Sequence, residues 1–266
     1  MAILDLPKDI WFAALGLTPD TMPDALILEG TWWRKIAEAD RLGQLTDVRE
    51  AAFPDIFLGR HGDARIAYCC AYGAARAVEP AHVFAQMGVP LIVQIGTCGA
   101  LAPGLGAGSV MVPDLALARD GVSGSYGGDA AVALDDGASR AARKALDGMG
   151  IPHHNGTHLT WTSLFAQSDA ICAEWAAQGI ATVDMEAAAV ATVARRFGSR
   201  AAALLAVWDA LAEGKTFLDP LPAADEAALR RANAATFTVA LALAAGVAAE
   251  RTDDNKTTTT LGGKTR

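Results

Sequence analysis

Short apolar segments alternate with helix-like segments along nearly all of this chain, and this alternation limits the folds that it can adopt. Buried strands are predicted at residues 24–29, 64–70, 91–95 and 201–208, and helices at 32–42, 79–87, 186–197 and 223–250. Strands alternating with helices predict an α/β fold with a largely parallel core sheet. Because no linker or internal repeat interrupts the run, we expect one domain over residues 1–250. The polar, low-complexity residues 251–266 predict a disordered tail.

Charge and targeting signals exclude several classes of protein. The formal net charge of -8 disfavours a nucleic-acid binder, whose affinity depends on Lys and Arg at phosphates, although a few local Arg residues can still hold a small anion. The N-terminus lacks the pattern of a signal peptide, and the apolar run 239–249 is too short to span a bilayer, so no membrane partner is expected. The four Cys residues form no CxxC pair, which favours reduced thiols and a cytoplasmic protein.

The Gly-rich stretch "IGTCGALAPGLGAG" at residues 95–108 follows a predicted strand. Its glycines at 104, 106 and 108 give GxGxG rather than GxGxxG, and a strand-like segment follows, so a dinucleotide loop is disfavoured. A turn from Gly96 to Gly99 would aim backbone N–H groups at an anion, although a tight turn alone gives the same pattern. We interpret Cys98 within it as a small buried residue rather than a nucleophile.

Charged residues at the ends of predicted strands are the other candidates. Gly30 and Arg34 follow the first strand at a spacing suited to an anion, with surface exposure of the Arg as the plain alternative. Asp209 ends the last strand, where open α/β sheets bind ligands, and is either a proton donor or base or a cap. Asp184 and Glu186 stand where a strand gives way to a helix. Burying two carboxylates is costly, so they are either caps or partners of ligand hydroxyls.

A histidine cluster raises the question of a metal. His153, His154 and His158 are close in sequence, but Pro152 and Gly156 break the helix that would place them on one face. Because no carboxylate or Cys is close in sequence, we expect no metal site.

Five motifs together resemble the nucleoside phosphorylase/hydrolase superfamily, in particular uridine phosphorylase and trimeric-type purine nucleoside phosphorylase. They are "LGLT" at 15–18, "LILEGTWWRKIAE" at 26–38, "GVPLIVQIGTCGAL" at 88–101, "VDMEAAAV" at 183–190 and "LLAVWDAL" at 204–211. The resemblance runs from about residue 10 to about residue 245. It implies a single α/β domain with a central mixed, mostly parallel sheet flanked by helices. It also implies a pentosyltransferase that cleaves an N-glycosidic bond, with inorganic phosphate as co-substrate and no cofactor.

The resemblance also implies roles for particular residues. Glu186 would accept hydrogen bonds from the ribose hydroxyls, and Asp209 would assist the leaving base. The other residues implied at the substrate are Met185, Asp184, Phe165, Thr97 and Gly99. Those implied at the phosphate are Gly30, Arg34, Arg49, Gln94 and Thr97. In the family the residue at the Arg49 position reaches in from a neighbouring subunit, so a homo-oligomer, dimer or hexamer, is expected.

Several positions depart from the family pattern. Gln94 stands where the phosphorylases usually have Arg, Trp32 and Trp33 enter the phosphate loop, and Ala14 replaces a His that contacts the 5′-hydroxyl. These departures leave two alternatives open, namely a nucleoside hydrolase of the same fold and a non-catalytic member that binds nucleosides or serves in assembly. Asp209 favours a purine base, and Gln167 is the nearest candidate for reading uracil.

Overall fold

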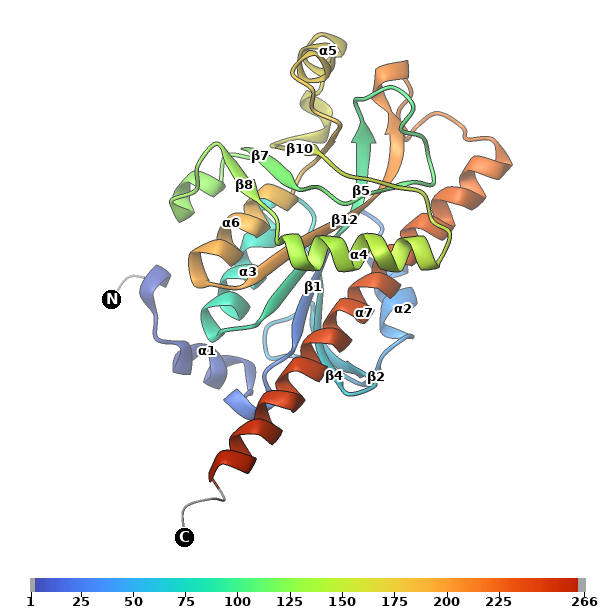
Figure 1. The fold of residues 1–266 in the computed structure, drawn as a ribbon. Coiled ribbons are helices and arrows are strands. Elements are labelled where there is room, and N and C mark those ends of the chain that lie inside the picture. The colour runs from blue at the N-terminus through green and yellow to red at the C-terminus, as the bar shows by residue number, and fades with distance from the viewer. Residues whose placement is uncertain (1–2, 263–266) are drawn as a thin grey trace.

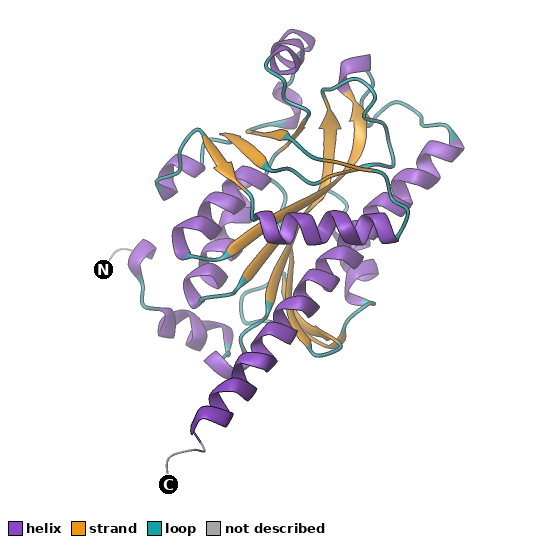
Figure 2. Cartoon of the chain, viewed as in Figure 1, coloured by secondary structure: helices purple, strands orange, loops and turns teal. Residues whose placement is uncertain are grey.

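The strands of this chain pair into one sheet with helices on both faces (Figures 1 and 2). The computed structural model describes residues 3–262, with side chains through residue 253. Within that range the sheet has twelve strands, of which nine follow the order β2-β3-β4-β1-β5-β11-β10-β7-β8. The other three lie off this path: β12 pairs with β5 and β6, and β6 also pairs with β9. The pairs of β1 with β4, of β1 with β5 and of β12 with β5 are parallel, whereas β11 meets β5 in antiparallel fashion. The predicted mixed, mostly parallel sheet is therefore confirmed.

The described strands are β1 Ala25–Gly30, β2 Thr46–Glu50, β3 Ile56–His61, β4 Ala64–Cys70, β5 Leu91–Ala100, β6 Val110–Met111, β7 Leu115–Arg119, β8 Ala131–Ala133, β9 His153–His154, β10 Thr157–Trp161, β11 Thr182–Asp184 and β12 Arg200–Ala210. The described α-helices are α1 Lys8–Leu15, α2 Arg34–Leu42, α3 Ala74–Met87, α4 Asp136–Gly148, α5 Asp169–Ala177, α6 Ala187–Phe197 and α7 Ala223–Gly262. Short 3-10 helices include η4 Leu164–Ala166 and η5 Leu211–Glu213.

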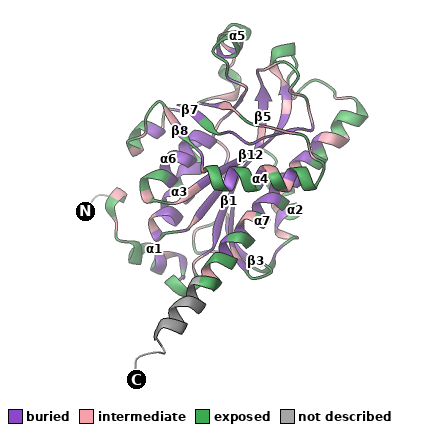
Figure 3. Ribbon diagram, in the orientation of Figure 1, coloured by how far each residue is buried: buried purple, intermediate pink, exposed green. Residues whose placement is uncertain are grey.

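Two hydrophobic clusters cover the two faces of the sheet. Helices α1, α3 and α6 pack on one face, for example through Phe84 and Val190, and helices α4 and α7 pack on the other through Leu146 and Phe237. Figure 3 shows the central strands buried between these helices. Burial on both faces explains why β1, β5 and β12 are nearly continuous apolar runs in the sequence.

Strand β5 runs through the Gly-rich segment that we expected to form a turn. It continues to Ala100 and pairs with β12 as far as Ala210. Glycines let other segments approach this part of β5 closely, because a Cβ on Gly96 would lie 2.9 Å from the carbonyl oxygen of Gly30 on β1, and one on Gly99 would lie 2.6 Å from Leu211 Cδ1 in η5. The turn prediction is therefore wrong, and the glycines serve close approach of neighbouring chain segments.

The last helix is longer than the predicted 223–250. Helix α7 continues to Gly262, and Arg251 Nε donates a 2.7 Å hydrogen bond to Oδ1 of the buried Asp24. The tail predicted to be disordered from residue 251 thus begins as helix, anchored by this ion pair. Residues 263–266 of the predicted tail lie outside the described residues.

Composition and burial of α7 bear on the membrane prediction. Residues 223–253 form a helix long enough to cross a bilayer, and its most apolar 18-residue window has a mean hydropathy of 1.6, but 56% of that window is buried inside the domain. Packing against the sheet accounts for the apolar character of α7. The cysteines Cys69, Cys70, Cys98 and Cys172 are all free and buried, as the prediction of reduced thiols requires.

Candidate active site

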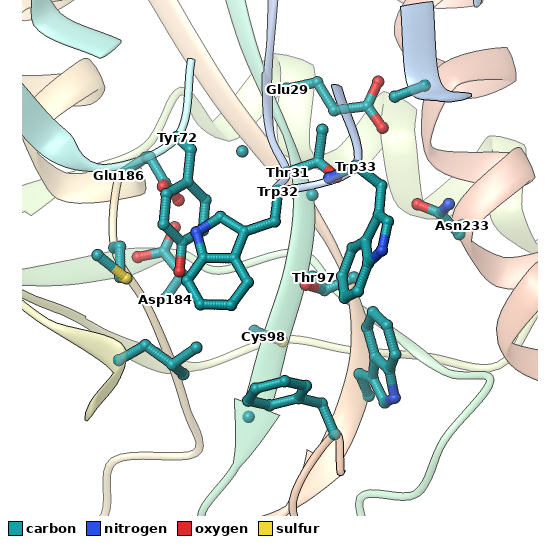
Figure 4. Close-up of a pocket in the computed structure, with 18 of the residues that line it drawn as sticks. Glu29, Thr31, Trp32, Trp33, Tyr72, Thr97, Cys98, Asp184, Glu186 and Asn233 are labelled. Carbon is teal, nitrogen blue, oxygen red and sulfur yellow. The ribbon is translucent and has the colours of Figure 1, made fainter. Parts of the chain in front are cut away.

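A cavity of about 300 Å³ opens where β1, β5 and β12 end (Figure 4). Its walls combine residues 29–33 at the end of β1, 36–41 of α2, 96–99 of β5, 183–186 around the end of β11, and 208–209 of β12. The carboxyl ends of neighbouring parallel strands meet at one edge of a sheet, which brings these distant segments together. The cavity is therefore at the place where the sheet topology predicts ligand binding.

Glu186 lies on one side of this cavity, immediately before α6. Its Oε1 accepts a 2.5 Å hydrogen bond from the backbone N–H of Gly73, which precedes α3. Burial, and secondly the charge of Asp184, raise the pKa of Glu186 well above the usual range of a carboxyl group, although the N–H groups of Gly73 and Met185 act in the opposite direction. The group is thus held in a position where ionisation is costly, which is typical of functional sites.

Gly30 lies directly against this carboxyl group. A Cβ at position 30 would be 2.7 Å from Glu186 Oε2. Glycine is required here so that the end of β1 can approach Glu186, a reason additional to the predicted approach of a ligand.

We expect Gly30→Ala to lower kcat/KM for the glycosidic cleavage that the family resemblance implies by about tenfold or more, because displacing a functional group by about 1 Å can cost up to two orders of magnitude in rate. Gly106→Ala is the matched control, since a Cβ there would meet no atom within 4 Å. Steady-state kinetics and a thermal melt of both variants check this. Equal activity of the two variants would contradict the close packing of Gly30 on Glu186.

Asp184 has a different environment from Glu186, although it also borders the cavity. Its Oδ1 accepts a 2.7 Å hydrogen bond from Thr160 Oγ1 and lies 2.9 Å from His158 Nε2, and its Oδ2 accepts a 2.9 Å hydrogen bond from the N–H of Ala187. Both oxygens are therefore engaged by the protein. Of the two carboxylates in "VDMEAAAV", Asp184 caps α6 and Glu186 faces the cavity. The contacts favour a positioning role for Asp184 over the substrate contact that we expected.

Asp209 faces the cavity from β12, beyond a register shift between Val207 and Asp209. Burial is the main cause that raises the pKa of this carboxyl group to about 7, although the backbone N–H of Phe217 lowers it. Its Oδ1 is buried and has no hydrogen-bond partner among the described residues. A buried, unpaired carboxyl oxygen with a pKa near neutrality is equipped to donate or accept a proton.

The cavity floor between these carboxyl groups comes from β5. Thr97 and Gly99 line it, as does Met185 after β11. Cys98 also borders it, but burial raises the pKa of its thiol well above the usual range and keeps it protonated. A nucleophilic thiolate at this position is therefore disfavoured, in agreement with our interpretation of Cys98 as a small buried residue.

Three of the predicted phosphate residues do not line the cavity. Arg34 is 47% exposed at its side chain and pairs with Asp55 at 2.9 Å, turned toward the β2–β3 loop. Gln94 is buried in the sheet, where its Nε2 donates to the carbonyl of Ile95. Arg49 lies on the exposed edge strand β2, and its predicted entry into a neighbouring subunit's site stays a prediction. Gly30 and Thr97 alone of the predicted set border the cavity.

Aromatic side chains surround the mouth of the cavity. Phe165 is 72% exposed and packs on Trp32 at a ring-centroid distance of 5.5 Å, so that its neighbours Leu164 and Gln167, rather than Phe165, line the cavity. Trp33 stacks on Trp208 at 5.4 Å. The two tryptophans that depart from the family's phosphate loop therefore form part of the wall. The expected contact of Phe165 with the substrate does not follow from this arrangement.

Sequence reasoning missed the polar and charged residues on the far side of the cavity. Glu29, Arg41 and Asn233 line it there, and Figure 4 shows Glu29 and Asn233 away from Glu186 and Asp184. Glu29 stands near the end of a buried strand, the same signal that identified Asp209. Arg41 carries no local signal, because helix α2 must fold back onto β1 before the two meet.

The three histidines do not converge. His153 Nε2 lies 3.0 Å from Asp147 Oδ1 at the surface, whereas His158 is buried between Thr182 and Asp184. Among residues 3–253, no group of three His, Cys, Asp or Glu side chains is arranged to hold a metal ion.

Comparison with known proteins identifies a matching family and several related sequences. The family model of the phosphorylase superfamily matches residues 42–245. A DeoD-type purine nucleoside phosphorylase of Geobacillus kaustophilus is 31% identical over 159 residues, which cover 54% of this chain and 65% of that protein. The DeoD-type enzyme of Myxococcus xanthus is 26% identical over 209 residues, covering 76% of this chain and 87% of the relative.

Phosphorylases with other names also resemble this chain, in sequence or in structure. A guanosine phosphorylase of Halorubrum lacusprofundi is 30% identical over 135 residues, covering 50% of this chain and 55% of that protein. The crystal structure of uridine phosphorylase from Vibrio fischeri superposes with a TM-score of 0.74 at 19% identity, covering 86% of this chain and 94% of the other. The structural similarity shows that the two proteins share their fold.

Proposed function

This chain belongs to the phosphorylase superfamily, and on that basis we propose that it is a nucleoside phosphorylase. In this proposal the enzyme is a pentosyltransferase that cleaves the N-glycosidic bond of a nucleoside and transfers the sugar to inorganic phosphate. The observation that carries the proposal is the convergence of two buried carboxyl groups, Glu186 and Asp209, on one cavity from separate strands. Their raised pKa values support chemical roles for both.

The reaction requires stabilisation of charge on both sides of the bond that breaks. Positive charge develops on the sugar as the bond lengthens, and a carboxylate placed near the ribose stabilises it. Positive charge on the sugar favours the ionised form of Glu186 and so opposes the effect of burial on its pKa. Glu186 is then suited to this role and to accepting hydrogen bonds from the ribose hydroxyls, with Met185 packed beside the sugar. Asp209, protonated near neutral pH, is suited to donating a proton to the leaving base.

A purine is the base that this arrangement favours. Asp209 supplies an acid at the end of β12, the position of the purine-type acid in the family resemblance. The names of the DeoD-type and guanosine relatives also favour a purine nucleoside. A non-catalytic role is disfavoured, because burying a carboxyl group with one oxygen unpaired, as in Asp209, costs stability that a structural role alone does not explain.

The proposal also includes the oligomeric state of the protein and its cellular compartment. We expect a cytoplasmic homo-oligomer, a dimer or hexamer, in which Arg49 of a neighbouring copy approaches the cavity. Inorganic phosphate is the co-substrate, and no further cofactor is expected. Sedimentation velocity of the full chain would test the assembly, and a monomer would overturn it.

A nucleoside hydrolase is the second candidate, favoured by the charge of the cavity. Among the described residues that line it, Arg41 is the only basic one, against five acidic residues, Glu29, Asp40, Asp184, Glu186 and Asp209. Burial raises the pKa of Glu186 and Asp209, which reduces their charge, but the acidic residues still outnumber the single basic one and oppose the binding of a phosphate dianion where they are ionised. Water, being neutral, does not experience that repulsion.

Base release from a panel of purine and pyrimidine nucleosides, with and without phosphate, tests both candidates. The proposal predicts release from purine nucleosides that depends on phosphate. Equal release in phosphate-free buffer would establish the hydrolase, and no release from any nucleoside would overturn both candidates.

A further inference from the structure

A buried ion pair occupies the side of the cavity that the proposed mechanism does not use. Arg41 Nε donates to Glu29 Oε2 at 3.1 Å and Nη2 donates to Oε1 at 3.0 Å, so the two side chains form a fork. Tyr68 donates a further hydrogen bond to Glu29 Oε2 at 2.7 Å. Only 5% of the Arg41 side chain and 3% of the Glu29 side chain are exposed.

The guanidinium carbon of Arg41 lies 5.3 Å from the ring centroid of Phe237, and the guanidinium keeps one nitrogen, Nη1, without a hydrogen bond to the described protein. Nη2 also donates to the carbonyl oxygen of Asn233 at 3.2 Å. Nη1 has no hydrogen-bond acceptor among the residues that the structure describes, although Arg41 lines the cavity. Nη1 is also absent from the buried polar atoms that lack a partner, so it is accessible and can donate to a ligand in the cavity.

Groups that can donate hydrogen bonds to an oxyanion lie in the same cavity as Arg41, although acidic residues surround them. Glu29 is followed at once by Gly30, and the hydroxyls of Thr31 and Thr97 also line the cavity. Figure 4 shows both threonines between Glu186 on one side and Asn233 on the other. A ligand between Glu186 and Arg41 would therefore have hydroxyl donors around it and a guanidinium at its far end.

The other candidates for a phosphate cation are excluded by their positions in this chain. Arg34 is turned toward Asp55 and Glu38 at the surface, and the position usually held by Arg in the family is the buried Gln94. Arg41 is the one basic side chain among the described residues of the cavity wall.

We propose that Arg41 contacts the phosphate co-substrate through Nη1, and that Glu29 limits phosphate affinity by compensating the charge of the same guanidinium. This inference rests on the proposed function, since it names the residue that holds the second substrate. Glu29 orients Arg41 through the fork, but its negative charge repels an incoming anion. The pair would therefore give a rigid phosphate contact of moderate affinity.

Binding of inorganic phosphate to the full chain, measured by calorimetry, tests the inference in four variants. Glu29→Gln keeps the shape of the pair but removes the opposing charge, and we expect it to bind phosphate about tenfold more tightly than wild type. Arg41→Met is expected to bind phosphate at least about tenfold more weakly. Arg34→Gln, the matched control on the same helix, is expected to leave phosphate affinity unchanged.

The fourth variant guards against a loss of folding. Removing one partner of a buried ion pair is destabilising, whereas replacing both partners is often tolerated. Glu29→Gln combined with Arg41→Met is therefore expected to melt cooperatively and to lack phosphate binding. Phosphate should also raise the melting temperature of Glu29→Gln more than that of wild type, because a ligand stabilises the state that binds it.

Three results would overturn the inference. They are unchanged phosphate affinity in Arg41→Met, weaker binding in Arg34→Gln, and an absence of phosphate binding in both wild type and Glu29→Gln. The proposed function is tested separately by base release. If phosphate accelerates base release but Arg41→Met retains the wild-type KM for phosphate, the inference about Arg41 fails and the phosphorylase proposal stands. If base release does not depend on phosphate, the proposed acceptor fails.

Discussion

Replacing Glu186 with glutamine is expected to lower kcat/KM for nucleoside cleavage by about two to three orders of magnitude, while the protein remains folded. The loss follows because a preorganised group that stabilises charge in the transition state contributes about 2.7–4 kcal/mol. The introduced amide would retain an oxygen for the N–H of Gly73 but not the negative charge beside the sugar. Steady-state kinetics with a purine nucleoside measure the effect.

Glu174→Gln is the matched control for Glu186→Gln. Glu174 lies exposed on α5, outside the cavity, so the same chemical change there should leave kcat/KM unaltered. A folded Glu186→Gln variant with wild-type activity would remove Glu186 from the mechanism.

Replacing Asp209 with asparagine is expected to lower kcat for purine nucleosides by about a hundredfold, since general acid catalysis contributes about 10²–10⁴ in rate. The acid must be protonated, so wild-type kcat should fall as pH rises above about 7, the pKa of Asp209. The variant should lack this dependence. A riboside whose leaving group needs no protonation, such as nitrophenyl riboside, should be cleaved by the variant at nearly the wild-type rate.

Stability provides an independent test of the same carboxyl group. The pKa of Asp209 is about 7 in the folded protein, against 3.8 for an unperturbed group, so between these values the folded state binds more protons than the unfolded state. Stability from this group therefore falls as pH rises from about 4 to 7 and stays low above that. Asn has no carboxyl group to ionise, so Asp209→Asn removes the cost of ionising a buried group. We expect the free energy of unfolding of the variant to exceed that of wild type at pH 8 by roughly 2–4 kcal/mol. Equal or lower stability of the variant at pH 8 would contradict the buried, unpaired environment of Asp209.

The central strands were predictable because their physical cause is local. The apolar runs at 24–29, 64–70 and 201–208 signal burial directly, and the corresponding strands β1, β4 and β12 coincide with them to within a few residues. The extension of β5 through residues 96–100 was not predictable in this way. Glycine and threonine carry no apolar signal, and it is pairing with β12, more than 100 residues away, that keeps this segment extended.

The carboxyl groups of the site were predictable for a similar reason. Glu186 and Asp209 stand beside the ends of buried strands, and sheet topology then brings such positions to one edge. The positions of the basic side chains relative to the cavity could not be predicted from the sequence. Arg34 is the first residue of α2. Its side chain points away from the cavity because it forms an ion pair with Asp55, which lies 21 positions away in a loop. Arg41 reaches the cavity only because α2 packs back on β1, a contact that no local pattern encodes.

The role of Asp184 could not be predicted from the sequence either, although the residues that decide it are closer in the chain. Sequence spacing placed two carboxylates at the start of α6 but left open which of them would act as a cap. On the neighbouring strand β10, Thr160 donates a hydrogen bond to Asp184 and His158 Nε2 lies 2.9 Å from the same carboxyl oxygen, so Asp184 is engaged by the protein. The pairing of β10 with β11 therefore decides which carboxylate faces the ligand.

The sugar product formed from a purine nucleoside in phosphate buffer is the most direct test of the account. Phosphorus NMR of the full reaction distinguishes a sugar phosphate from free sugar. Ribose 1-phosphate formed in equal amount to the free base, and absent with Glu186→Gln, is the predicted result. Free ribose together with free base would contradict phosphate as the acceptor, and an unchanged nucleoside would contradict glycosidic cleavage itself.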